Sequence, residues 1–127
     1  MANRLFNQFS FGLEKMRVSL FLSFSIDGSG DPVLDVANSK GIASITKLGT
    51  AGKYRITMQD AYVKLLMVEQ LPVNPVSAAV LMSLDNDDVQ NKIIDIQFAS
   101  LVTGTGTYLS SGESRKMVLV LRNSTAP

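Results

Sequence analysis

Residues 16–26 constrain the fold of this chain more than any other segment. From Met16 to Ile26 every second side chain is apolar, and the positions between them carry serines, Arg17 and Phe21. A period of two over this many residues predicts a β-strand with one buried face, because successive side chains of a strand point to opposite sides. A strand with one buried face needs a second layer, so we expect further strands in the rest of the chain.

Short strand patterns recur along the sequence, separated by turn residues. After the first strand we expect strands at residues 41–48, 53–58, 76–84, 92–98 and 115–121. The turn residues Gly49–Gly52 predict a hairpin of the strands at 41–48 and 53–58. The turn residues Asp85–Asp88 predict a second hairpin, of the strands at 76–84 and 92–98.

The remaining segments read as connections. Residues 33–40 are expected to form a loop with a short extended piece, and residues 59–66 a short helical turn, because the apolar period changes there. Two prolines make residues 71–75 a breaker, and residues 101–114 form a long loop rich in glycine, serine and threonine.

This succession of short strands predicts an all-β fold. We expect an antiparallel β-sandwich or a jelly-roll-like barrel with one short helical turn. A chain of 127 residues fits one such domain. Its predicted parts are an N-terminal arm at residues 1–13, the β-sandwich domain at residues 14–122 and a C-terminal tail at residues 123–127.

The composition argues against enzyme chemistry. The chain has no histidine and no cysteine, which excludes the triads, dyads and metal sites that use imidazole or thiolate groups. A formal net charge of +1 gives no electrostatic reason to expect nucleic acid as a partner. No apolar run approaches the ~20 residues of a membrane helix. We therefore expect no enzyme, no cofactor, no nucleic acid and no membrane.

The N-terminal arm carries the first candidate binding residues, Arg4, Phe6, Phe9 and Phe11. Aromatic side chains are costly to leave in water, so the arm either packs on its own molecule or anchors the chain to a neighbouring subunit or a larger assembly. The predicted strands also carry apolar residues on their second faces, at Phe21, Leu81, Ile93, Val118 and Val120. Apolar residues on these second faces favour binding to a neighbouring subunit or to a larger assembly.

Basic residues gather in the middle third of the chain. Lys53 and Arg55 share one strand face, and we add them as candidates for binding an acidic partner. Ordinary outward-facing strand positions explain them equally well.

Two ligand sites remain as alternatives. The acidic group Asp85, Asp87, Asp88 and Asp95 could bind Ca²⁺, but it lacks the glycine and closing glutamate of an EF-hand loop, so a solvated turn is favoured. The glycines around Thr105 could cradle a phosphate, but neither a lysine-serine pair nor a helix follows them.

Three sequence blocks add a resemblance to these observations. The start MANRLFNQFSFGLEK, the centre NSKGIASITKLGTAGKYRITMQDAYVKLL and the end LVLRNSTAP resemble a group of small virion proteins of tailed bacteriophages, grouped with capsid decoration or cement proteins. The resemblance covers the beginning, middle and end of the chain, and residues 71–114 match only in general character.

The resemblance implies a structural protein that binds the outer surface of the phage head and stabilises the capsid. It implies the major capsid protein as the partner and the virion surface as the location, after synthesis in the host cytoplasm. A dimer or trimer suits binding at a symmetry axis.

Three alternatives stay open. The first is a host- or glycan-binding module that uses Tyr108, Glu113, Asn86 and Asp87. The second is a head–tail connector or tail subunit, and the third is a small hydrolase.

Overall fold

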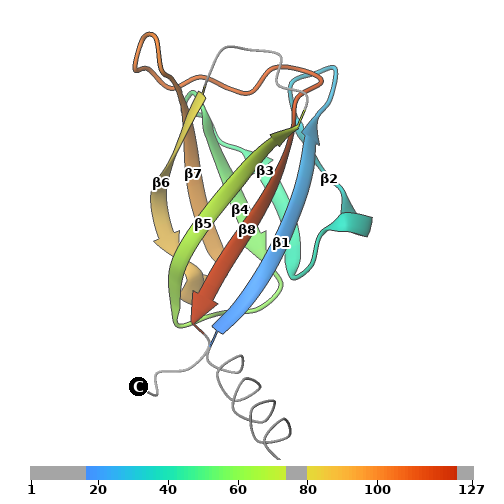
Figure 1. Ribbon diagram of the computed structural model, residues 1–127, viewed down its shortest axis with the longest axis vertical. Coiled ribbons are helices and arrows are strands. Elements are labelled where there is room, and N and C mark those ends of the chain that lie inside the picture. Colours follow the sequence, from blue (N-terminus) through green and yellow to red (C-terminus); the bar gives the residue numbers. More distant parts are fainter. Residues whose placement is uncertain (1–16, 74–79, 123–127) are drawn as a thin grey trace, which may run out of the picture.

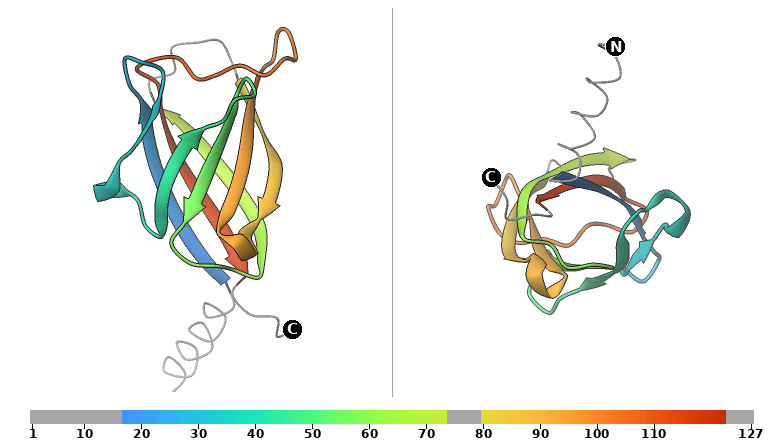
Figure 2. Two further views of the ribbon diagram at one scale, coloured as in Figure 1. Left: turned by 180° about the vertical axis from the view of Figure 1, so that it is seen from behind. Right: turned by 90° about the horizontal axis from the view of Figure 1, so that it is seen from below.

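The chain folds into two antiparallel sheets of four strands that pack face to face as a β-sandwich (Figure 1). The computed structural model describes residues 17–73 and 80–122. The view along the sandwich shows the two sheets curling around one shared interior (Figure 2). The predicted fold class is therefore confirmed, in its sandwich form.

Each sheet joins strands that are distant in the sequence. In sheet 1 the order is β2 (Pro32–Leu34), β1 (Arg17–Ile26), β8 (Ser114–Arg122) and β5 (Lys64–Val73). In sheet 2 the order is β3 (Ile42–Lys47), β4 (Lys53–Met58), β7 (Ile93–Ser100) and β6 (Val80–Asp88). Two 3-10 turns, η1 (Val36–Asn38) and η2 (Val89–Asn91), complete the described elements. β5 and β6 are edge strands of different sheets.

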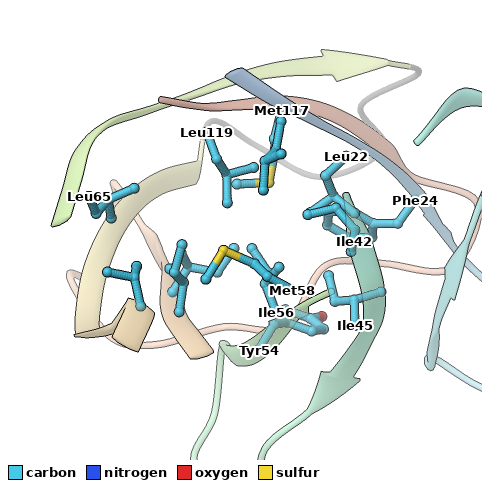
Figure 3. Close-up of a cluster of buried hydrophobic side chains, with 14 of the residues drawn as sticks. Leu22, Phe24, Ile42, Ile45, Tyr54, Ile56, Met58, Leu65, Met117 and Leu119 are labelled. Atoms are coloured by element: carbon cyan, nitrogen blue, oxygen red, sulfur yellow. The ribbon is translucent and has the colours of Figure 1, made fainter. Parts of the chain in front are cut away.

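The alternating segment forms β1 and supplies much of the core. Leu20, Leu22, Phe24 and Ile26 are buried, while Phe21 faces outward and is 47% exposed. Apolar side chains from both sheets point toward one another across the interior (Figure 3). Burying one face of each sheet is the main stabilising contribution in such a fold, because it removes apolar surface from water.

The helical turn expected at residues 59–66 is not found, and that expectation was wrong. Backbone N–H groups there bond to distant segments instead of to the preceding turn. The N–H of Tyr62 donates to the Val89 carbonyl at 3.0 Å, and that of Val63 donates to the Arg122 carbonyl at 3.0 Å. These bonds lead directly into β5, and the 3-10 turns lie elsewhere, in η1 and η2.

Two turn expectations also needed correction. Asp85–Asp88 was expected to be a hairpin turn, but these residues continue β6, which accommodates an irregular register between Leu84 and Asn86. The reversal is made by η2 and by Lys92, whose backbone is left-handed with φ 67°. Pro72 was expected to break a strand, but it lies inside β5, where an edge position tolerates its missing N–H.

Candidate interaction surface

The outer face of sheet 2 is mostly polar, with Leu81 and Ile93 as apolar residues on it, and two of its cations are paired with acids of the same chain. The guanidinium of Arg55 on β4 donates two hydrogen bonds to Asp95 on β7, at 2.9 Å to Oδ1 and 3.1 Å to Oδ2. This hydrogen bonding, with the charge of Asp95, raises the pKa of Arg55 above its usual value. Lys53 Nζ lies 3.1 Å from Asp85 Oδ2. Both predicted cations therefore already have an acidic partner within the chain.

The predicted binding residues are placed unequally. Lys53 and Arg55 do share the outer face of one strand, as expected, but their role in binding a partner stays a prediction. Arg4, Phe6, Phe9 and Phe11 lie outside the described residues. Among residues 17–73 and 80–122, no group of three or more acidic side chains is placed to hold a metal ion.

The outer face of sheet 1 is different in character, because apolar side chains from three adjacent strands lie side by side on it. The β1–β8 and β8–β5 registers set Phe21 beside Val118, and Val120 beside Met67. Leu71 extends the apolar surface along β5. Phe21, Met67 and Leu71 are 47%, 55% and 61% exposed. We call this surface the apolar face.

The apolar face has polar borders. At one end the registers align Arg17, Arg122 and Lys64 in a row across three strands. Within the face, Lys116 on β8 and Glu69 on β5 stand among the apolar residues. Long charged side chains at a rim keep an exposed apolar surface soluble while leaving its centre accessible.

A groove of about 530 Å³ lies on the apolar face, between η1 and β5. Phe21, Val118 and Leu71 contribute apolar surface, while Asn38 and Lys116 contribute polar groups. This mixture of apolar surface and polar groups suits the side chains of a partner protein at the centre of an interface.

The residues proposed for a glycan site are not presented together at the surface. Glu113 is fully buried, its carboxylate accepts a hydrogen bond from the Ser110 N–H, and Arg115 Nη2 lies 3.5 Å from it. The Tyr108 hydroxyl donates to the Leu48 carbonyl, and Lys47 Nζ lies 4.1 Å from the centre of its ring. Both side chains serve to fasten the β7–β8 loop to the sandwich.

Backbone N–H groups on both sides of Thr105 are already used within the chain, so they are not open for a phosphate. The N–H of Gly104 donates to the Ser100 carbonyl at 2.8 Å, and the N–H of Thr107 donates to the Phe98 carbonyl at 3.0 Å. A phosphate loop needs several convergent, unused N–H groups.

A Ser-x-x-Lys spacing at Ser44 and Lys47 lies on β3. Residues three apart on a strand point to opposite sides, so the strand does not bring the Ser44 hydroxyl to the Lys47 ammonium. The sequence does not reveal Met67 and Leu71 as surface residues, because the expected helical turn ends at residue 66 and the expected breaker begins at residue 71. An irregular register between Leu65 and Met67 hides their alternation.

No protein-family model, curated protein or solved structure matches this chain. A search of the described residues finds no helix that is long and apolar enough to cross a membrane.

Proposed function

We propose that this protein is a structural virion protein that binds the outer surface of a phage head and stabilises the capsid, with the apolar face of sheet 1 as its contact surface. The observation that carries the proposal is the difference between the two outer faces. One gathers exposed apolar side chains across three adjacent strands, and the other is mostly polar, with Lys53 and Arg55 paired to acids and Leu81 exposed on its edge strand. An asymmetric sandwich of this kind suits a protein that lies on a larger surface.

The apolar face has the properties of an interface centre. Phe21, Met67 and Leu71 together leave a large apolar area in water, and burying such area contributes roughly 25 cal/mol per Å². Sheet strands fix the backbone beneath these side chains, so binding requires no backbone ordering there and the entropy cost is limited to side-chain rotamers. The cationic row of Arg17, Arg122 and Lys64 would lie against acidic residues of the partner.

The assignment of the partner to a capsid shell rests on the sequence resemblance. The major capsid protein is the proposed partner, and the N-terminal residues Arg4, Phe6, Phe9 and Phe11 would extend the contact. A protein that binds only the intact shell stabilises it by mass action. The small net charge of +1 limits repulsion between copies that crowd one surface.

Binding of purified protein to isolated heads that lack it tests the proposal. Phe21→Asp places a charge in the middle of the apolar face, and we expect affinity to fall about 30-fold, or roughly 2 kcal/mol, as at a central interface residue. Thr46→Asp is the matched control, because Thr46 is an exposed strand residue on the opposite outer face. This control should bind like the wild type.

Leu71→Asp provides a second substitution on the apolar face, on an edge strand that tolerates a polar residue. Circular dichroism and the thermal midpoint confirm that each variant is folded. Equal binding by the folded apolar-face variants and Thr46→Asp would contradict the proposed contact surface. A wild-type protein that binds glycans but no head shells would support the adhesion alternative instead.

A further inference from the structure

A short, ordered projection at the end of the sandwich carries two exposed aliphatic side chains. We call residues 101–105, in the loop between β7 and β8, the finger; this loop projects beyond the sheets (Figures 1 and 2). Leu101 is 59% exposed and Val102 is 83% exposed. Leaving two such side chains in water at the tip of a loop has no benefit for the folding of the domain.

The finger is held in shape by its own hydrogen bonds. The N–H of Ser100 donates to the Thr105 carbonyl at 3.0 Å, and the N–H of Gly104 donates back to the Ser100 carbonyl at 2.8 Å. The Ser100 hydroxyl accepts from the Val102 N–H at 3.2 Å. A loop already fixed in one conformation loses little entropy on binding, so the finger is well suited to insertion into a partner.

A matching recess lies where the two sheets meet. The edge strands β5 and β6 leave an opening of about 250 Å³, which we call the seam. The side chains that line it are all apolar: Leu65, Leu66, Met67, Val68, Met82, Leu84 and Ile96. Of these, Leu66, Met67 and Leu84 are 45%, 55% and 50% exposed.

The character of the seam limits what can occupy it. The volume is below the roughly 300–1,000 Å³ of ordinary small-molecule sites, and no polar side chain lines it to orient a ligand. An added β-strand is also disfavoured, because β5 and β6 both have irregular registers and β5 contains Pro72. Aliphatic side chains inserted from another protein fit these constraints best.

We propose that the finger of one copy inserts Leu101 and Val102 into the seam of a second copy. The two surfaces match in chemistry, since an aliphatic tip meets an aliphatic recess, and both leave large apolar side chains exposed in the isolated chain. Each copy carries one finger and one seam, so the contact is repeated either reciprocally in a dimer or head to tail in a closed ring.

Disulfide trapping tests the contact on isolated protein, without any capsid. The chain has no cysteine, so single-cysteine variants have a clean background. Val102→Cys and Leu84→Cys are prepared with different mass tags, mixed, and oxidised in a glutathione buffer. Cysteines held together in a complex act at effective concentrations near millimolar, so we expect roughly ten-fold more mixed disulfide than in the control.

The control mixture combines Leu84→Cys with Thr46→Cys, an exposed strand residue on the outer face of sheet 2. Leu66→Cys gives a second position in the seam if Leu84→Cys is unstable. The inference is supported if mixed disulfides form preferentially and light scattering finds the wild type as a dimer or a larger ring. It is overturned by a monomeric wild type, or by mixed disulfides no more abundant than in the control. Met67 borders both the seam and the apolar face. Neither result depends on capsid binding, because both are measured on isolated protein without heads.

Discussion

At the scale of single residues, Tyr54 joins parts of the chain that are distant in the sequence. Its ring packs against Phe98 and Tyr108, with centroids 5.7 Å and 5.8 Å away, and its hydroxyl accepts a hydrogen bond from the Leu109 N–H at 3.1 Å. The sequence placed Tyr54 correctly on the apolar face of its strand. It could not reveal the partners, since they come from β7 and from the loop that follows it.

Replacing Tyr54 with phenylalanine should reduce stability and change its pH dependence. The variant leaves the buried Leu109 N–H without its partner, at a cost of about 1–3 kcal/mol in the free energy of unfolding. Burial raises the pKa of Tyr54 above 10.0, so the wild type loses stability as pH rises past that value, where the unfolded chain releases the proton first.

Urea unfolding at neutral pH and above pH 10.0 measures both effects. The decline in stability at high pH should be shallower in Tyr54→Phe than in the wild type. Part of the decline that remains in the variant comes from Tyr62, because burial raises the pKa of that side chain as well. An unchanged alkaline decline would contradict the assignment of this titration to Tyr54.

At the scale of elements, the β3–β4 hairpin shows why some predictions were right. The alternation of Tyr54, Ile56 and Met58 and the glycines of the turn are local signals, and the structure confirms them. The helical turn expected at residues 59–66 was wrong because bonds to distant segments decide that region. The turn expected at residues 85–88 was wrong because the β6–β7 ladder continues through these residues and the reversal comes one step later, in η2. The local sequence pattern does not indicate which distant segments will bond to one another. For the same reason it does not show that β5 lies beside β8.

The turn glycine Gly52 has a structural requirement that Gly49 lacks. Gly52 has φ +81°, and an added Cβ would lie 2.2 Å from the Phe98 carbonyl oxygen, whereas nothing lies within 4 Å at Gly49. Gly52→Ala should therefore lower the free energy of unfolding by about 2–4 kcal/mol, while Gly49→Ala stays within about 0.5 kcal/mol of the wild type. Chemical denaturation compares the two, and equal stabilities would show that the hairpin does not depend on this close approach.

For the whole molecule, the two outer faces differ although both sheets are amphipathic. The sequence predicted five apolar residues on second faces. The structure places Phe21, Val118 and Val120 together on sheet 1, and Leu81 and Ile93 on the outer face of sheet 2. It could not predict that Lys53 and Arg55 would be neutralised by acids from β6 and β7. The apolar face is thus the stronger candidate for contact with a shell, and the contribution of the N-terminal arm stays a prediction.

Electron cryo-microscopy of heads assembled with and without this protein tests the central claim most directly. We expect additional density on the outer surface of the head, into which the sandwich fits with the apolar face of sheet 1 toward the shell and Arg55 toward solvent. Density that orients sheet 2 toward the shell, density confined to the tail or connector, or identical heads in both samples would contradict it.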